Sequence, residues 1–300
     1  MNRSVGTLLL VLVIQCLILA TVYWPGSGRH QQASREPMLA FGPDAVNEIY
    51  IGDEYDNETV VRRAGDRWVL PELEQLPADS ARIEALLAGI TSSENDWPVA
   101  DSIAARQRFQ VASYHYQRRL RLLNYDELLA TLYLGTSPGH RKVHARNDGQ
   151  DAIYSIPFNT FDAPGVSGAW LDRKLLQIRT PLGITADSYS LRREGGKWRS
   201  GLDREPDERE LLALLSGLRS LQVSGVARED LQRDLAEAEP ELVLKVTSLA
   251  GDVTLELFTI DTAHFIHSSK YPLFFTLDSY NHDRLTSIDF RLISGEDTAN

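Results

Sequence analysis

The feature that most constrains the fold of this chain is an internal repeat, because one pattern of residues occurs twice after residue 40. Residues 60–68 and 190–198 each predict a strand, a tight turn containing glycine, a basic residue and a tryptophan. Each copy is followed by apolar residues spaced i, i+3, i+4 and i+7, which is one face of a helix. These residues are Ile83, Leu86, Leu87 and Ile90 in the first copy and Leu211, Leu214, Leu215 and Leu218 in the second. Such a repeat indicates one architecture built twice.

The residues after each helix pattern indicate strands joined by short turns. The segments that align are 131–134 with 254–257 and 152–156 with 273–277. Short turns imply antiparallel neighbours. We therefore expect an α+β fold with two tandem repeats, each an antiparallel sheet (a hairpin plus a meander) packed with one main helix. The first α+β repeat is predicted to span residues 41–182 and the second residues 183–300.

Two further features recur at matching places. Trp68 and Trp198 close the two hairpins, and we expect them to pack each hairpin against its helix; an exposed aromatic that binds a partner is the alternative. Gly89 and Gly217 occur at the same position of the two helix patterns. The shared glycine adds to the similarity of the two helix patterns.

Residues 1–24 are predicted to form an N-terminal transmembrane anchor, and residues 25–40 a tether. Residues 5–24 carry no charge, and about 20 apolar residues cross a bilayer as a helix. A cleaved signal peptide is an alternative, but the segment offers poor cleavage sites. A lipoprotein with its lipid on Cys16 is another, but Gln15 is large where a small residue is expected. The full fold expected is thus a transmembrane helix followed by the two repeats.

The anchor would place the rest of the chain outside the cytoplasm, in the periplasm of a bacterium. Cys16 is the only cysteine, so the folded part has no thiol to oxidise in that compartment. The net charge of −11 excludes a nucleic-acid partner, which requires a surplus of basic residues. The chain also lacks the glycine-rich phosphate-binding motifs, so it is not the ATPase of a transporter. One spanning helix cannot line a permeation path.

The order of several short motifs resembles the family described as domain of unknown function 4340. The chain departs from the family pattern at Gln110-Val111, where Gly-Leu is usual. The motifs are the Arg-x-Gly-x-x-Trp hairpin, the Pro-Asp start of a leucine-rich helix, Phe109-Gln110-Val111, Leu-Tyr-Leu-Gly at 132–135 and Trp-Leu-Asp-Arg-Lys-Leu-Leu at 170–176. The resemblance covers most of residues 41–290. It implies a single-pass, envelope-facing protein, often encoded beside ABC transporters of the gliding-motility auxiliary type, with no catalytic residues to carry over.

The histidines do not predict a metal site. His140 and His144 would share one face of a helix, but turn residues on both sides favour a hairpin. On a solvent-facing strand the pair would lie about 13 Å apart, too far to share one ion. His264 and His267 fall in the equivalent hairpin of the second repeat. Being three apart on a strand, they are expected to point to opposite faces.

Three other clusters receive structural interpretations. The residues around Ser167 lack the last glycine of a nucleophile elbow, so residues 165–169 are interpreted as a connector. The acidic run 53–58 lacks the central glycine of a calcium-binding loop and is interpreted as a solvated hairpin tip. A basic cluster is interpreted as the solvent face of an edge strand, where charge blocks aggregation; contact with an acidic partner or a lipid headgroup is the alternative. The cluster comprises Arg106, Arg108, Arg118, Arg119 and Arg121.

These observations predict a membrane-anchored, periplasm-facing accessory protein that is not an enzyme and associates with an ABC-type transport or envelope complex. It would bind through a sheet edge or the cleft between the repeats. No catalytic, cofactor-binding or metal-binding residue is assigned. One alternative is a small-ligand-binding module between the two repeats. The other is an envelope hydrolase, which a pocket combining His115 with aspartate or glutamate neighbours would favour.

Overall fold

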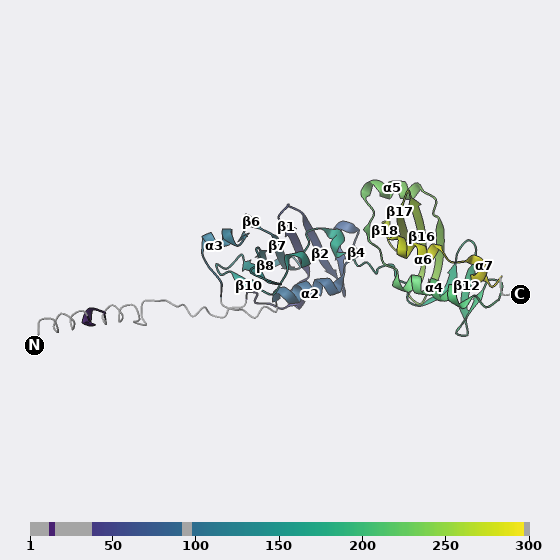
Figure 1. The fold of residues 1–300 in the computed structure, drawn as a ribbon, viewed down its shortest axis with the longest axis horizontal. Helices are drawn as coiled ribbons and strands as arrows, with labels where there is room; N and C mark the ends of the chain where they lie inside the picture. Colours follow the sequence, from purple (N-terminus) through teal and green to yellow (C-terminus); the bar gives the residue numbers. More distant parts are fainter. Residues whose placement is uncertain (1–11, 16–37, 92–97, 297–300) are drawn as a thin grey trace, which may run out of the picture.

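The structure, a computed structural model, describes residues 12–15, 38–91 and 98–296. Two lobes lie next to each other along its long axis (Figure 1), each built on one antiparallel sheet of eight strands. We refer to them as the first unit, which holds strands β1 to β10, and the second unit, which holds strands β11 to β18. The α+β class and the antiparallel pairing are as predicted.

The first unit orders its strands β10-β9-β8-β7-β1-β2-β3-β4. A separate hairpin of two short strands, β5 and β6, lies outside this sheet. The strands are β1 (Glu48–Asp53), β2 (Glu58–Ala64), β3 (Arg67–Leu70), β4 (Leu76–Pro77), β5 (Val111–Ala112), β6 (His115–Tyr116), β7 (Arg118–Asn124), β8 (Glu127–Leu134), β9 (Val143–Asn147) and β10 (Tyr154–Ile156).

The second unit orders its strands β13-β12-β11-β15-β16-β17-β18-β14. Its strands are β11 (Pro181–Thr185), β12 (Ser190–Glu194), β13 (Lys197–Ser200), β14 (Gly225–Val226), β15 (Leu242–Ser248), β16 (Gly251–Ile260), β17 (Ala263–Ser268) and β18 (Phe275–Leu277). Seven consecutive strands of this order match seven of the first unit. The two sheets differ at their ends. Strand β4 extends the first beyond β3, whereas no strand of the described residues extends the second beyond β13, and β14 extends the second beyond β18.

The strand registers show that the repeat holds residue by residue. Arg63 pairs with Trp68 in the first hairpin, and Arg193 pairs with Trp198 in the second. In the meanders, Ala145 pairs with Tyr154 as Ile266 pairs with Phe275. Strands β1, β2, β3, β7, β8, β9 and β10 of the first unit therefore have counterparts in β11, β12, β13, β15, β16, β17 and β18 of the second.

Helices cover both faces of each sheet, which corrects the expectation of one main helix per repeat. One main helix, α2 or α4, buries the predicted apolar face against each sheet, except that Leu211 is only half-buried. A second helix, α3 or α5, covers part of the opposite face over a smaller apolar cluster. The helices are α2 (Ser80–Thr91), α3 (Ile103–Arg108), α4 (Glu208–Ser220), α5 (Glu229–Glu237), α6 (Ser279–Thr286) and α7 (Phe290–Ser294).

The recurring helix glycine allows a close approach in both units. A Cβ at Gly89 would lie 3.2 Å from Cδ2 of Phe158, and a Cβ at Gly217 would lie 3.0 Å from Cδ2 of Leu285. Phe158 follows the last strand of the first sheet, and Leu285 on α6 follows the last strand of the second. The glycine therefore lets the chain leaving each sheet pack onto the main helix.

The segment between the two sheets is buried and bonded to both units. It contributes the buried side chains Trp170, Leu171, Leu176 and Ile178. The backbone N–H of Asp172 donates to the first unit at the Pro77 carbonyl (2.9 Å), and that of Ile178 donates to the second unit at the Leu218 carbonyl (3.0 Å). Four short 3-10 helices complete the fold: η1 (Pro43–Ala45), η2 (Pro71–Leu73), η3 (Thr160–Asp162) and η4 (Ser167–Trp170).

The predicted fold is wrong in placing a transmembrane helix ahead of the repeats. Among the described residues, none of the helices combines the length and the apolar character needed to cross a membrane. Of the predicted anchor, the structure describes only residues 12–15, and the predicted tether lies outside the described residues except for 38–40. A span needs about 20 helical residues, and the longest helix of the described residues, α4, has 13.

Candidate functional site

Two arginines of the basic cluster form ion pairs across the sheet of the first unit. Arg119 and Arg121 both donate to the Glu58 carboxylate, each at 2.9 Å, across strand β1. Gly52 separates Arg119 from Glu58 in the strand register and leaves room for the arginine to cross. Arg121 also lies over the Tyr50 ring, 4.2 Å from its centroid. The expected edge strand is wrong, because β7 lies between β1 and β8.

The remaining members of the basic cluster also have partners. Arg106 pairs with Asp151, and Arg108 lies over the Phe109 ring. Arg118 donates to the backbone carbonyl of Ala163 at 2.8 Å. The cluster therefore does not present five free cations to an acidic partner.

The prediction that His140 and His144 both face solvent on one strand is wrong. His140 is exposed in the loop before β9, whereas His144 on β9 is buried. His144 stacks on Phe109 with ring centroids 4.0 Å apart, and its Nδ1 donates to the Thr136 carbonyl at 2.8 Å. The reason is the layer of α3 and the β5–β6 hairpin, which covers this face of the sheet. Burial lowers the pKa of His144.

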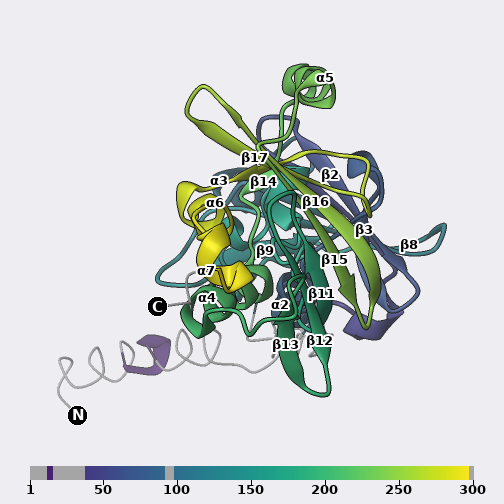
Figure 2. The same cartoon turned by 90° about the vertical axis from the view of Figure 1, so that its right-hand side faces the viewer.

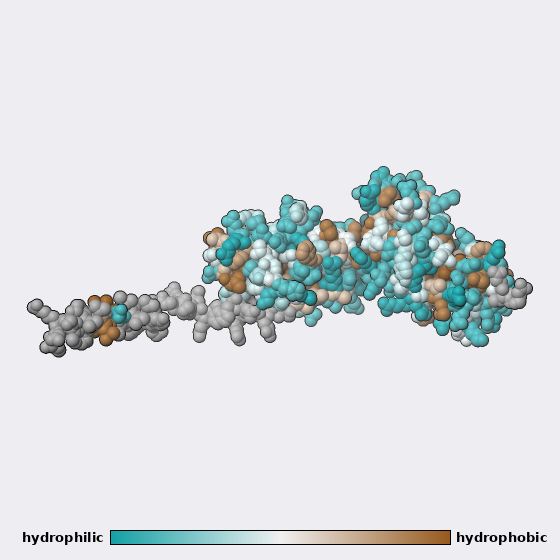
Figure 3. Space-filling view, viewed as in Figure 1, coloured by the Kyte–Doolittle hydropathy of each residue, from teal (hydrophilic) through white to brown (hydrophobic). Residues whose placement is uncertain are grey.

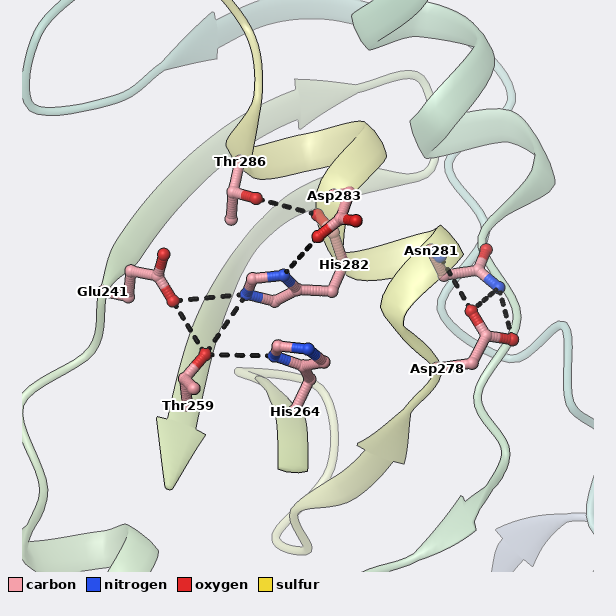
Figure 4. Close-up of polar contacts among 8 residues, drawn as sticks. All are labelled: Glu241, Thr259, His264, Asp278, Asn281, His282, Asp283 and Thr286. Carbon is pink, nitrogen blue, oxygen red and sulfur yellow. Dashed lines mark hydrogen bonds and ion pairs between the residues drawn. The ribbon is translucent and has the colours of Figure 1, made fainter. Parts of the chain in front are cut away.

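The histidines of the second unit point to opposite faces of β17, as predicted. His267 pairs with Glu256 on the face covered by α5. His264 stacks on His282 of α6, with ring centroids 3.9 Å apart (Figure 4). The contact between His264 and His282 could not be predicted from the sequence, because no local spacing connects β17 with a helix that follows the sheet.

The His264–His282 pair is the centre of a hydrogen-bonded chain. Nε2 of buried His282 lies 3.2 Å from Glu241 and Nδ1 lies 3.2 Å from Asp283, so the ring lies between two carboxylates. The Thr259 hydroxyl donates to Glu241 at 2.9 Å and accepts from Nδ1 of His264 at 3.1 Å (Figure 4). The cluster thereby fixes α6 against the ends of three strands. In the part of the chain that the structure describes, no group of three or more histidine, cysteine, aspartate or glutamate side chains is placed to hold a metal.

Ser167 takes part in a different network, without a histidine. Its hydroxyl lies 2.6 Å from that of buried Thr59 and donates to the Glu72 carboxylate. A serine nucleophile needs a base that can take its proton and a group that orients the base, whereas this network ties η4 to β2 and η2. Residues 165–169 are a connector, as predicted, but a fixed one.

A cavity of about 450 Å³ brings His115 together with acidic residues at the tip of the β1–β2 hairpin. Its lining comprises Asp53, Glu54, Tyr55, Asp56, Ser113, Tyr114, His115 and Tyr116. Burial opposes ionisation of Asp53, but hydrogen bonds from the Asn57 side chain and from the backbone of Tyr55 and Asn57 outweigh it and lower the pKa of this carboxyl. Those bonds occupy both carboxylate oxygens in shaping the turn.

The junction of the two units holds a smaller cavity of about 210 Å³. Arg82, Arg173 and Lys174 line it with Asp79, Asp172 and Gln222, among others. One carboxylate oxygen of Asp79 accepts from the Arg82 backbone N–H, and one of Asp172 accepts from that of Lys174. Arg82 itself donates to the Ala169 carbonyl and lies over the Trp170 ring. These side chains therefore already hold the inter-unit segment in place.

Strand β13 forms an uncovered edge of the second sheet. Gly195 and Gly196, both at positive φ, make the two-residue turn between β12 and β13. In such a hairpin Glu194 and Lys197 are the first hydrogen-bonded pair, and the next pair, Arg193 with Trp198, is not hydrogen-bonded. The backbone N–H and C=O of Trp198 therefore point away from β12. The bond from Gly201 N–H to the Ser190 carbonyl, 2.7 Å, continues the same alternation.

The matching edge of the first unit is covered. The carbonyl of Trp68, the counterpart of Trp198, accepts from the Ala78 N–H at 2.8 Å, and β4 continues this pairing. Trp68 is accordingly buried, while Trp198 is half-buried. In the second unit, the only described contact of this kind is two residues further on, where Ser200 N–H donates to the Arg204 carbonyl at 2.9 Å.

The uncovered edge is also basic. Residues 190–200 hold four basic side chains, Arg192, Arg193, Lys197 and Arg199, and one acidic side chain, Glu194. The ion pairs of this hairpin join Arg192 to Glu194 and Asp203, and Lys197 to Glu205. All of these side chains are at least half exposed, so the pairs neutralise the hairpin weakly. Figure 2 shows the hairpin extending from one end of the second lobe, opposite α5.

The face seen in Figure 3 is mostly hydrophilic, with apolar residues in small separate patches. A large apolar docking surface is therefore not visible from this side. The backbone edge of β13, rather than an apolar patch, is the candidate interaction site of the second unit.

A family model with the description "Domain of unknown function (DUF4340)" matches residues 68–241. The match begins at Trp68 of the first unit and ends just before β15 of the second, so it covers more than half of the chain and includes the β12–β13 hairpin. No curated protein and no solved structure matches the chain.

Proposed function

Since the chain belongs to the family of the domain of unknown function DUF4340, we propose that it is a non-catalytic interaction protein of a periplasmic envelope complex at the bacterial inner membrane. Within that complex it would serve an ABC-type transporter as an accessory subunit. The proposal takes the family's envelope setting from the resemblance of the sequence motifs. It takes the mode of action from the shape and charge of the second unit.

The observation that carries the proposal is the uncovered edge of β13. A sheet edge presents backbone donors and acceptors that another chain can pair with, and proteins usually cover or shorten such edges. The first unit covers its matching edge with β4. An edge left open in one of two otherwise matching sheets is typical of a surface used for binding.

The ionisable clusters support a non-catalytic role, because their members hold the fold together. The His282 ring lies between two carboxylates, Glu72 accepts from Ser167, and Glu58 binds two arginines. The Thr259 hydroxyl lies 3.4 Å from Nε2 of His282, whose Nδ1 lies 3.2 Å from Asp283, but this hydroxyl donates its proton to Glu241 at 2.9 Å. Groups committed in this way are poorly placed to act as acid, base or nucleophile.

Co-purification tests the proposed function. The tagged full-length chain would be isolated from membranes in mild detergent, and bound proteins identified by mass spectrometry. We expect transporter or other envelope subunits in amounts comparable to the chain, and absent from an untagged control. Recovery of the chain alone, at several detergent strengths and after mild cross-linking, would contradict the proposal.

A second candidate function, an envelope hydrolase, is favoured by one observation. The cavity beside the β1–β2 hairpin combines His115 with Asp53, Glu54 and Asp56. A panel of ester, amide and phosphoester substrates, assayed with the full chain and with His115→Ala, tests it. Turnover that the His115 substitution abolishes would support the hydrolase and contradict the interaction role. If there is no turnover, or if the substitution does not change it, the hydrolase is contradicted.

A further inference from the structure

We propose that the open edge of β13 binds an extended acidic segment of a partner protein, which adds to the second sheet as a further strand. The inference rests on the proposed interaction role and names the chemistry of the partner. Two groups carry it: the outward backbone of Trp198 and the basic side chains on either side of it.

The residue of β13 whose backbone would pair with an added strand is Trp198. Trp198 offers one donor and one acceptor toward the open side, and in the first unit the matching carbonyl accepts from Ala78. An incoming residue opposite Trp198 would donate its N–H to the Trp198 carbonyl and accept from the Trp198 N–H. The described chain places β4 at this position in the first sheet and no strand there in the second.

The side chains of β13 define what the incoming strand should carry. Trp198 packs toward the core, so Lys197 and Arg199 point to the opposite face of the sheet. Arg199 lies directly opposite Arg192 in the register, and β11 contributes only Gly183 to that row. Like charges opposite each other are unfavourable. Acidic residues flanking the residue opposite Trp198 would relieve this repulsion, and an apolar residue between them would extend the contact with the Trp198 ring.

The same charges disfavour a second copy of this chain as the occupant. If β13 paired antiparallel with itself, Lys197 and Arg199 would meet the Lys197 and Arg199 of the other copy. Four basic side chains would then meet on one face, where the described ion pair of Lys197 with exposed Glu205, at 3.7 Å, neutralises them weakly. A partner with acidic residues at alternate positions fits better.

The test uses the full chain and a seven-residue peptide, acetylated and amidated, in which glutamate and valine alternate around a central valine. Binding would be measured by titration calorimetry at low and at physiological salt. We expect saturable binding of one peptide per chain, weakened by salt, and at least tenfold weaker binding of the lysine–valine peptide. If the two peptides bind alike, or neither binds, the proposal is overturned.

Two modifications separate strand addition from simple attraction of charges. N-methylation of the central valine removes its N–H but keeps the charges, and we expect at least a tenfold loss of affinity. The Lys197→Glu/Arg199→Glu variant should lose binding to the same degree. Arg233→Glu is the matched control, because Arg233 is exposed on α5 at the other end of the lobe, and it should bind normally. Unchanged affinity of the methylated peptide would contradict strand addition.

Amide hydrogen exchange gives a readout that does not depend on variants that fold. Binding of the glutamate–valine peptide should slow exchange at the Trp198 amide. The amides of Lys197 and Arg199 already bond to β12 and should change little. Protection spread evenly over the hairpin would point to charge attraction, and sedimentation showing a dimer that Arg199→Glu disrupts would assign the edge to a second copy; either result overturns the proposal.

The co-purification experiment and these measurements can fail independently. If envelope subunits co-purify equally with the wild type and with Lys197→Glu/Arg199→Glu, the proposed function stands and the β13 inference falls. If no partner co-purifies, the proposed function fails whatever the peptide does.

Discussion

The first and second units share one arrangement of strands, but they differ in one row of residues that lie opposite one another across neighbouring strands. In the first unit the row is Glu48, Arg62, Val69 and Pro77, and Arg62 forms two hydrogen bonds to Glu48. In the second unit the matching row is Gly183, Arg192 and Arg199, and it ends at the open edge. The second unit therefore has no carboxylate in this row, has a second arginine, and has no described covering strand. Such a combination changes a closed edge into a basic, open one.

The two sheets also differ on the face covered by α3 or α5, because the covering layer lies at a different distance from the sheet. Gly135 follows β8 in the first unit and lies under the backbone of Phe109 and Gln110. Its counterpart by register is Phe258, whose ring packs against Phe274 under α5. One unit brings a backbone close to the sheet, and the other fills the space with aromatic rings.

The largest expected effect concerns this glycine. In Gly135→Ala the added Cβ would lie 2.0 Å from the Phe109 carbonyl oxygen and 2.4 Å from that of Gln110. Backbone atoms cannot move aside without displacing α3, so we expect a loss of about 3 kcal/mol or more in the free energy of unfolding. Urea denaturation measures it. Gly149→Ala, where nothing lies within 4 Å, is the control and should change stability little; equal effects would contradict the close approach.

The second test compares the two tryptophans. Trp68 is 2% exposed, and Trp68→Ala should cost about 3–5 kcal/mol, as for other buried aromatic truncations. Trp198 is half-buried at the open edge, so Trp198→Ala should cost roughly half as much. Denaturation of both variants under the same conditions checks the ratio. A cost at Trp198 as large as that at Trp68 would mean that the β13 edge is covered in solution.

The third test uses the titration of His144. Burial lowers the pKa of His144, so the unfolded chain binds a proton more readily than the folded one. Stability from this group is complete above the ordinary histidine pKa of about 6.5 and falls as the pH drops from there toward the lower folded pKa. His144→Phe gives the first unit the residue at the matching position, Phe265 of the second. Urea denaturation from pH 7.5 to 5 should show a smaller decline in the free energy of unfolding for the variant than for the wild type. Parallel curves would show that His144 does not cause the decline.

The smallest expected effect distinguishes the two helix glycines. Alanine raises helix propensity by about 1 kcal/mol over glycine, but in each helix the new methyl group meets a neighbour. At Gly89 that neighbour is the Phe158 ring, whereas at Gly217 the Arg284 carbonyl also lies 3.4 Å away. Gly217→Ala should therefore be less stable than Gly89→Ala, by less than about 1 kcal/mol. The reverse order in thermal denaturation would contradict this difference.

The repeat made much of the strand framework predictable. Residues 60–68 and 190–198 were aligned from sequence, and the register pairs Arg63 with Trp68 and Arg193 with Trp198. The alternation of apolar residues and the turn residues acts over a few positions, so it can be seen in the chain. The predicted Gln110-Val111 departure also has a structural meaning: Gln110 adopts φ 55°, a conformation that glycine adopts without strain.

The candidate sites were far less predictable, because their parts come from distant segments. His282 meets His264 and Glu241 only through the packing of α6 on the second sheet. His144 was expected at the surface, and only the α3 layer buries it. The local pattern around Arg119 and Arg121 suggested an edge strand, since alternation along one strand does not reveal how many strands lie on each side.

The sequence by itself determined the duplication, the α+β class, the main helices and the absence of a recognisable catalytic motif, because these depend on spacing along the chain. Tertiary structure alone decided which edge is open. The hairpins at Trp68 and Trp198 read almost alike. The difference is that residues 76–78 return to pair with β3, whereas the described segment after β13 bonds to its backbone only at Ser200, whose N–H donates to the Arg204 carbonyl. Edge pairing is a contact between segments whose proximity depends on the whole fold, so the sequence of one hairpin cannot reveal it.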